Sequence, residues 1–235
     1  MNLRHPPFFS TLLKYASIAR THLQSHGFTH SAAQLGRELL FDLHNGVETT
    51  LPRNPSSNPS HFNPILYQGA DPKIVRDLFT RLPLAAKAST FMDFGCGKGR
   101  ALILAAQHGF RRVVGVELDH DLVSLCRINL GNLKRSKDEP FPEVYQADAT
   151  RFELPPGALT AFLYNPFLGP PLQSVVSRLV QHARTSGNPV RVIYVNPQSL
   201  NTFLDHGFTI THSLRHRSLQ LAVLMEIPGF HGGGL

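Results

Sequence analysis

Three carboxylates stand at or just beyond the ends of apolar segments that are typical of strands: Asp93, Glu117 and Asp148. In a parallel α/β sheet, ligands bind in the crevice outside the carboxyl ends of the strands. From there Glu117 can accept hydrogen bonds from both hydroxyls of a ribose, and Asp148 can accept one from an adenine amino group. The alternative role for an acid at a strand end is to cap the next helix, as we expect for Asp119 and as Asp148 could also do. Together the three acids predict a site for an adenosine-containing ligand.

A glycine-rich turn separates the first two acids. Gly95, Gly97 and Gly99 alternate with other residues, and the following Ala101-Leu-Ile-Leu-Ala-Ala is typical of a helix. A strand, a tight glycine turn and a helix allow the backbone to approach a nucleotide-like ligand closely. We interpret Cys96, inside this turn, as a small loop residue rather than a nucleophile. The turn is therefore expected to bind the ligand through its backbone.

Two ligands compete for this turn, a dinucleotide and S-adenosylmethionine. A dinucleotide site needs Gly-x-Gly-x-x-Gly, but Arg100 occupies the third glycine position and the third glycine falls at Gly99. Asp93 would repel a pyrophosphate, whereas it suits a ligand with a cationic sulfonium or ammonium group. The residues therefore favour S-adenosylmethionine over NAD. The expected cofactor-binding residues are Asp93, Gly95, Cys96, Gly97, Gly99, Glu117, Leu118, Asp148 and Ala149.

Over about residues 71–226 the sequence resembles the class I S-adenosylmethionine-dependent methyltransferases. The segment Asp93-Phe-Gly-Cys-Gly-Lys-Gly99 is similar to their first motif, whose backbone holds the methionine and ribose parts of the cofactor. Glu117 matches their ribose-binding acid and Asp148 their adenine-contacting acid. The resemblance implies methyl transfer by in-line displacement from the sulfonium to a nucleophile, with catalysis mainly from positioning and desolvation.

Asn165-Pro166-Phe167 ends the fourth predicted strand, where such methyltransferases place residues that face the transferred methyl group. It is similar to a shortened Asn-Pro-Pro-Tyr/Phe motif of enzymes that methylate exocyclic or amide nitrogen. In that motif the asparagine side chain and the proline carbonyl orient the amino group, and the aromatic ring packs on it. Because the second proline is missing, the segment is no less similar to the short motifs of lysine-methylating class I enzymes. The structural alternative is a turn capped by Asn165.

We therefore predict a nitrogen acceptor, with catalytic roles for Asn165, Pro166 and Phe167. A second Asn-Pro pair, Asn196-Pro197, ends the fifth predicted strand, so we expect Asn196 to lie beside Asn165, although such an asparagine more often begins a helix. The acceptor itself stays open among small molecules, proteins and nucleic acids. A non-catalytic cofactor-binding module and a nicotinamide-dependent oxidoreductase are the alternative functions.

Alternating strands and helices from Asp71 onward predict an α/β fold, a doubly wound, mostly parallel seven-stranded sheet with helices on both faces. Only a short turn around residues 213–217 separates the last two strands, so they should form a terminal antiparallel hairpin, as in the seventh strand of the methyltransferase fold. The predicted strands are 90–94, 112–117, 142–146, 160–165, 189–195, 207–212 and 218–226. The predicted helices of this part are 72–82, 98–108, 120–133, 171–184 and 197–205.

An N-terminal helical appendage precedes this part, with helices predicted at 10–24 and 31–44 and stops at Gly27 and Gly46. Residues 45–71 are rich in proline and should form a loop that is either a functional lid or disordered. The predicted organisation is an N-terminal region with a lid or linker at 1–70, a cofactor-binding domain at 71–228 and a flexible glycine-rich tail at 229–235.

The composition bounds the partners and the compartment. The 235 residues include 23 Lys and Arg against 16 Asp and Glu, which suggests an acidic or nucleic-acid partner, although the scattered positions favour a solvated basic surface. Two cysteines form no disulfide framework, so we expect a cytoplasmic protein. Residues 1–37 lack acidic side chains, as transit peptides do, but an amphipathic helix explains them better. No apolar run suits a membrane span, and the 13 histidines show no metal-binding spacing, so we expect neither membrane nor metal binding.

Overall fold

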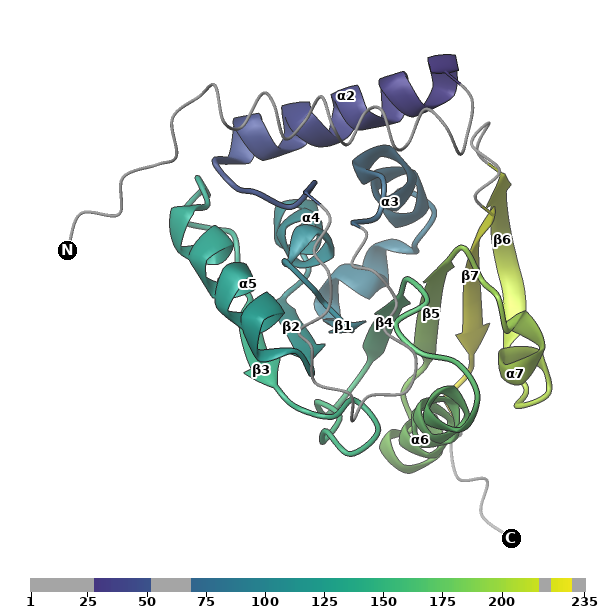
Figure 1. The fold of residues 1–235 in the computed structure, drawn as a ribbon. Helices are drawn as coiled ribbons and strands as arrows, with labels where there is room; N and C mark the ends of the chain where they lie inside the picture. Colours follow the sequence, from purple (N-terminus) through teal and green to yellow (C-terminus); the bar gives the residue numbers. More distant parts are fainter. Residues whose placement is uncertain (1–27, 52–68, 216–220, 230–235) are drawn as a thin grey trace, which may run out of the picture.

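The computed structural model describes residues 28–51, 69–215 and 221–229, and its centre is a seven-stranded sheet (Figure 1). The strand order is β3-β2-β1-β4-β5-β7-β6. Strands β1 to β5 are parallel, and β7 runs antiparallel to both β5 and β6, which confirms the predicted fold class. The strands are β1 (Thr90–Phe94), β2 (Arg112–Glu117), β3 (Glu143–Gln146), β4 (Leu159–Leu163), β5 (Val190–Val195), β6 (Thr209–Arg215) and β7 (Leu221–Ile227).

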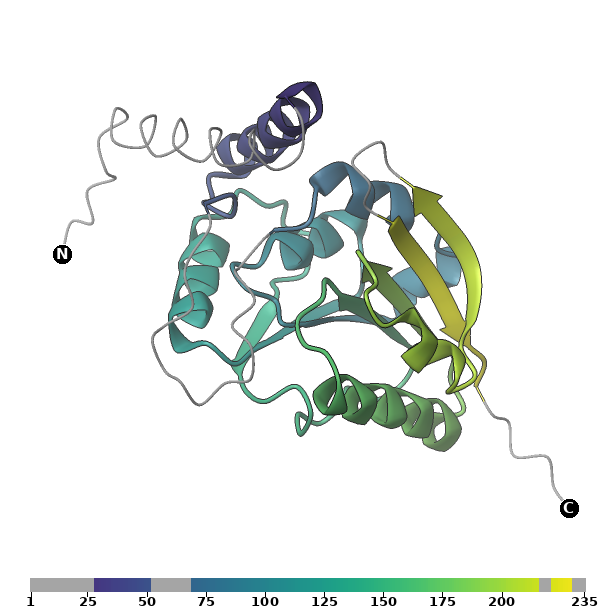
Figure 2. The same ribbon diagram turned by 45° about the vertical axis from the view of Figure 1, so that its right-hand side comes forward.

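Helices cover both faces of the sheet (Figure 2). One apolar core lies between the sheet and the side that carries α2, α3, α4 and α5, and the other lies between the sheet and α6 with α7. Strand β1 is buried along its whole length, because Phe91 enters the first core while Met92 and Phe94 enter the second. The helical elements are α2 (Phe28–Asn45), α3 (Pro72–Phe79), the 3-10 helix η1 (Leu84–Ala88), α4 (Arg100–His108), α5 (His120–Asn132), α6 (Pro170–Ser186) and α7 (Leu200–Leu204).

Several predicted boundaries were wrong. Helix α4 begins at Arg100 rather than at residue 98, because Gly99 has the left-handed conformation that ends the glycine turn. Helix α3 ends at Phe79, so residues 80–82 form a turn where the last turn of the helix was predicted, and the 3-10 helix η1 follows. Helix α7 is limited to residues 200–204, and strand β4 stops at Leu163. Strand β6 extends through Arg215, so the hairpin turn begins later than predicted.

The N-terminal predictions are tested in part. The helix predicted at 31–44 is α2, which ends at Asn45 before Gly46 as expected. The helix predicted at 10–24, residues 52–68 of the predicted lid and the tail beyond residue 229 lie outside the described residues. The division of the chain at residues 70 and 71 stays a prediction. None of the described helices has both the length and the apolar character that a bilayer-spanning segment requires.

The topology places the carboxyl end of β1 at the point where the strand order reverses. From β1 the chain continues to β2 and β3 on one side and then returns to β4 and β5 on the other. Such a switch point is where open α/β sheets bind their ligands. The glycine turn leaves β1 at this point.

Candidate functional site

The glycine turn has a backbone conformation in which other residue types would be strained. Gly95, Gly97 and Gly99 have φ angles of 82°, 52° and 90°, in the left-handed region. The N–H groups of Gly95 and Cys96 both donate to the carbonyl oxygen of Val116 on β2, at 2.8 and 3.1 Å. Gly99 also lacks room for a side chain, because a β carbon there would lie 2.6 Å from the sulfur of a buried cysteine. The turn is therefore a closely packed backbone cradle, and a small-molecule ligand can approach its main chain.

Asp93 lies buried on strand β1, two residues before Gly95 of this cradle. Its neighbours in register are Gly115 on β2 and Phe162 on β4. Burial raises the pKa of Asp93 well above its usual value, and the negative charge of Glu117 raises it further. A cationic ligand beside these two acids would relieve both effects. The site therefore fits the sulfonium and ammonium groups of S-adenosylmethionine.

Glu117 ends β2 beside the glycine turn. One carboxylate oxygen, Oε1, accepts hydrogen bonds from the backbone N–H groups of Leu118 and Asp119 at 2.8 and 3.0 Å. The other, Oε2, accepts from the N–H of Gly97 at 2.9 Å. Burial raises the pKa of Glu117, while these backbone hydrogen bonds act in the opposite direction. The carboxylate is thus held at the turn, where a ribose-binding acid is required.

Asp119 is the N-cap of α5, as predicted, because its side chain accepts from the N–H groups of Asp121 and Leu122. Asp148 also has a local role, since Oδ1 accepts from the N–H and the hydroxyl of Thr150 at 2.8 and 2.7 Å. The hydrogen bond from the Thr150 side chain is the main reason that the pKa of Asp148 is lowered.

Asp148 is exposed and follows β3, so it keeps the position that the sequence predicted at the rim of the sheet. Its contact with adenine stays a prediction. The same holds for Leu118, which is also exposed, and for Ala149, whose carbonyl accepts a hydrogen bond from Arg178 at 3.1 Å.

The two Asn-Pro pairs meet at the ends of neighbouring strands. Leu163 on β4 pairs in register with Tyr194 on β5, so Asn165 and Asn196 come two residues later on each chain segment. Both asparagines have positive φ, 44° and 51°, a conformation that no other non-glycine residue adopts in the described part of the chain. Asn165 Nδ2 donates a hydrogen bond of 2.5 Å to the carbonyl oxygen of Asn196. This confirms that Asn196 lies beside Asn165.

The other polar atom of the Asn165 side chain, Oδ1, makes no hydrogen bond with the described residues. Asn165 is 5% exposed, and its Oδ1 atom is buried without a hydrogen-bond partner among the described residues. Because Nδ2 is held by a carbonyl, the atom left over is a hydrogen-bond acceptor. A buried acceptor without a partner is costly, about 1–3 kcal/mol, unless a ligand supplies a donor.

Pro166 joins this motif to the cofactor turn. A β carbon on Gly95 would come within 2.5 Å of the Pro166 Cβ atom, so the proline ring lies directly on the glycine. Phe167 is half-buried and packs against the core on the α6 side of the sheet. The structure thus brings the predicted acceptor motif and the predicted cofactor turn into contact.

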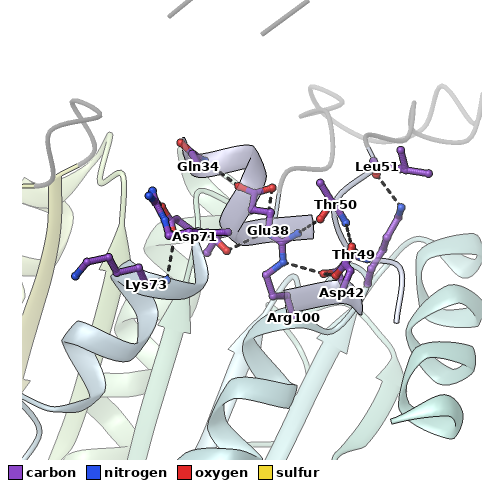
Figure 3. Close-up of polar contacts among 12 residues, drawn as sticks. Gln34, Glu38, Asp42, Thr49, Thr50, Leu51, Asp71, Lys73 and Arg100 are labelled. Atoms are coloured by element: carbon purple, nitrogen blue, oxygen red, sulfur yellow. Dashed lines mark hydrogen bonds and ion pairs between the residues drawn. The ribbon is translucent and has the colours of Figure 1, made fainter. Parts of the chain in front are cut away.

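Two charged residues of the turn were missed as structural anchors. Lys98 and Arg100 are both almost fully buried, and each forms an ion pair, with Glu48 and Glu38 respectively. Figure 3 shows Arg100 reaching from the start of α4 toward Glu38 on α2 and toward Thr49. From the sequence, Arg100 was interpreted only as a residue that argues against a dinucleotide site. The sequence feature that could have revealed them is a lysine and an arginine on either side of Gly99, at the start of a helix predicted to be buried, because buried charges need partners.

Comparison with known proteins places the site within one domain family. The family described as "Methyltransferase domain" matches residues 92–168, a range that contains every predicted cofactor residue and the Asn-Pro-Phe motif. A search of curated protein sequences finds no match.

Similar solved structures share the fold at low sequence identity. A putative RNA methyltransferase from Pyrococcus horikoshii has a TM-score of 0.55 at 14% identity, covering 85% of this chain and 100% of that one. Magnesium protoporphyrin IX methyltransferase from Synechocystis PCC 6803, solved with bound S-adenosylmethionine, has a TM-score of 0.51 at 14% identity, covering 66% and 77%. The glycopeptide N-methyltransferase MtfA in complex with S-adenosylmethionine has a TM-score of 0.53 at 10% identity, covering 73% and 99%.

The sheet itself argues against the nicotinamide alternative. A dinucleotide-binding sheet has the order 3-2-1-4-5-6, whereas here an antiparallel seventh strand lies between β5 and β6. The sheet topology, the matched family and the acidic cradle all support S-adenosylmethionine as the methyl donor.

Proposed function

Because this chain is a class I S-adenosylmethionine-dependent methyltransferase, we propose that it transfers the methyl group to a nitrogen atom that carries at least one hydrogen and is bound by Asn165. The observation that carries the proposal is the buried Oδ1 atom of Asn165 beside the cofactor turn, which has no hydrogen-bond partner within residues 28–51, 69–215 and 221–229. An amine or amide N–H group would donate to this oxygen. The acceptor belongs to a protein side chain, a nucleobase or a small molecule.

The amide of Asn165 is oriented before an acceptor binds. Its Nδ2 atom donates to the Asn196 carbonyl, so the amide cannot turn over without losing that hydrogen bond. A fixed acceptor oxygen takes one N–H of the substrate and so directs the nitrogen lone pair away from itself. Such pre-organisation is how positioning contributes to catalysis.

The acidic cradle holds the cofactor. Glu117 suits the ribose hydroxyls, Asp93 suits the positive charge, and the backbone of Gly95, Gly97 and Gly99 allows close approach. S-adenosylmethionine held by these residues would supply an electrophilic methyl group to the nitrogen lone pair, with S-adenosylhomocysteine as the leaving group and the proton of the nitrogen released to solvent. Pro166, in contact with Gly95, keeps the Asn165 side of the site next to this cradle.

The test is methyl transfer from S-adenosylmethionine labelled in its methyl group into an extract of the source cells, followed by mass spectrometry of the labelled product. We expect an N-methyl product. The variant Asn165→Ala should lose the transfer while binding S-adenosylhomocysteine as the wild type does. The control is Asn201→Ala, an exposed asparagine on α7, which should transfer at the wild-type rate.

An O-methyl ester or S-methyl product, or full activity in Asn165→Ala, would overturn the nitrogen assignment. Neither result would affect the assignment of the cofactor. A separate titration with S-adenosylhomocysteine tests that assignment alone.

A further inference from the structure

We propose that Glu48 is a positioning residue for the cofactor turn, acting through Lys98, so that the segment after α2 sets the affinity for S-adenosylmethionine. The proposal rests on the assignment of the glycine turn as the cofactor site. Glu48 lies outside residues 92–168, the range that matches the methyltransferase family. Its role follows from a series of links that runs from Glu48 through Lys98 and Gly97 to Glu117.

The first contact is an ion pair between Glu48 and Lys98. Lys98 Nζ lies 2.9 Å from each carboxylate oxygen of Glu48, and it also donates to the carbonyl oxygen of Leu51 at 2.7 Å. The Lys98 side chain is 2% exposed, whereas that of Glu48 is 40% exposed. Lys98 therefore depends on this pairing far more than Glu48 does, because its charge is removed from water.

The second contact holds the backbone of the same two residues together. Asn129, on α5, donates from Nδ2 to the carbonyl oxygens of Glu48 and Lys98 at 2.9 and 3.0 Å. The N–H of Glu48 donates back to Asn129 Oδ1 at 2.9 Å. The side chain of Lys98 is thus held by the segment after α2, and its main-chain carbonyl is held by Asn129, which also binds the backbone of Glu48.

The remaining links run from Lys98 to Glu117, the predicted ribose-binding acid. Lys98 is bonded directly to Gly97, whose N–H donates to Glu117 Oε2 at 2.9 Å. A shift of Lys98 would move this N–H group and with it the carboxylate that suits the ribose. Main-chain hydrogen bonds to Val116 fix the start of the turn, at Gly95 and Cys96, whereas the contacts of Lys98 hold its second half next to Gly97.

Arg100 holds the same segment from the other side of Gly99. Its guanidinium donates to the hydroxyls of Thr49 and Thr50 at 2.8 and 2.9 Å, to the carbonyl of Ala70 at 3.0 Å, and pairs with Glu38 at 3.3 Å (Figure 3). Asp42 on α2 in turn accepts from both threonine backbones. The partner segment of Lys98 is therefore itself rigidly attached, which a positioning role requires.

The test is calorimetric titration of the full chain with S-adenosylhomocysteine. Glu48→Gln should raise Kd about 5- to 30-fold, as expected for weakening a hydrogen-bonded charge pair with one buried member. The matched control is Asp77→Asn, which removes the acid of an exposed ion pair with Lys73, whose side chains are 50% and 44% exposed. The control should change Kd less than about twofold.

Two further measurements separate positioning from folding. Thermal unfolding without ligand gives the Tm of each variant, and titration is done well below the lowest Tm. The double variant Glu48→Gln with Lys98→Met should bind no more weakly than Glu48→Gln alone, because the two residues act as one unit. Glu48→Asp, which keeps the charge, should recover part of the affinity.

The proposal would be overturned if Glu48→Gln lowered Tm but left Kd at the wild-type value. Additive losses in the double variant would also contradict it. Absence of binding by folded wild-type protein would overturn the cofactor site as well, so the two failures are distinguishable.

Discussion

The ring of Pro166 lies directly on Gly95, with the Pro166 Cβ atom only 2.5 Å from where a β carbon of Gly95 would stand. This contact joins the loop after β4 to the loop after β1 at the switch point of the sheet. The methyl donor and the nitrogen acceptor are thereby expected on neighbouring loops. Position 95 requires glycine for two reasons, namely the φ angle of 82° in the turn and the close approach of the Pro166 ring.

Replacing Gly95 with alanine should weaken binding of S-adenosylhomocysteine at least about tenfold, because the new methyl group displaces Pro166 or the turn. Gly157→Ala is the matched control, since Gly157 also has a positive φ, 88°, but nothing lies within 4 Å of its added β carbon. The control should cost about 1–2 kcal/mol of stability from backbone strain alone. Equal Kd values for the two variants, measured by calorimetry, would argue against a role for the Gly95 contact.

Glu117→Ala removes the acid that suits the ribose. We expect the affinity for S-adenosylhomocysteine to fall by about 1.5–3 kcal/mol, the usual contribution of hydrogen bonds to a charged group. Glu143→Ala on β3 is the comparison, because Glu143 pairs with Arg112 away from the glycine turn. Titration calorimetry decides, and an affinity of Glu117→Ala indistinguishable from the wild type would remove the ribose assignment.

Asp93 should make the stability of the ligand-free protein fall as pH rises. Its pKa is raised in the folded state by burial and by Glu117, so its contribution is fully present below the unfolded pKa and is lost as pH rises through the raised folded pKa. Urea unfolding at a series of pH values should show a smaller decline in Asp93→Asn than in the wild type. At each pH, the difference between the free energies of unfolding of the wild type and the variant isolates the effect of Asp93 from that of Glu117, whose pKa is also raised.

The same variant should respond to the cofactor in the opposite direction. Asp93→Asn removes a buried charge, so the ligand-free protein gains stability, but it also removes the group that suits a sulfonium. Stabilisation by S-adenosylmethionine should therefore be smaller in the variant and should increase less with pH, because Glu117 is then the only one of the two acids that remains. Equal stabilisation of both proteins at every pH would contradict the electrostatic role of Asp93.

Asn196 should act through its backbone carbonyl. Asn196→Gly tolerates the φ of 51° and keeps the carbonyl that holds Asn165, so methyl transfer should stay within about twofold of the wild type. Asn196→Val should lower both stability and kcat, because a β-branched residue is strained at positive φ. Loss of activity in Asn196→Gly would instead indicate that the Asn196 side chain contacts the substrate.

The sequence alone determined the features that depend on local pattern. Apolar periodicity and turn residues identified the strands and the hairpin, and the order of glycines and acids predicted the cofactor cradle. Exact ends were lost where a backbone conformation decided them, as at Gly99, whose left-handed φ delays α4 until Arg100. Asn165 was predicted as a strand residue and instead lies in the loop after β4.

Only the tertiary structure decided which distant groups meet. No local pattern reveals that the Asn196 carbonyl binds the Asn165 Nδ2 atom, that Oδ1 has no partner in the part of the chain that the structure describes, or that Pro166 covers Gly95. The pairing of Lys98 with Glu48, 50 residues away, is of the same kind. Hydrophobic periodicity is set by neighbours along the chain, whereas these contacts arise because parallel strands and their crossovers bring their carboxyl-end loops to one edge of the sheet.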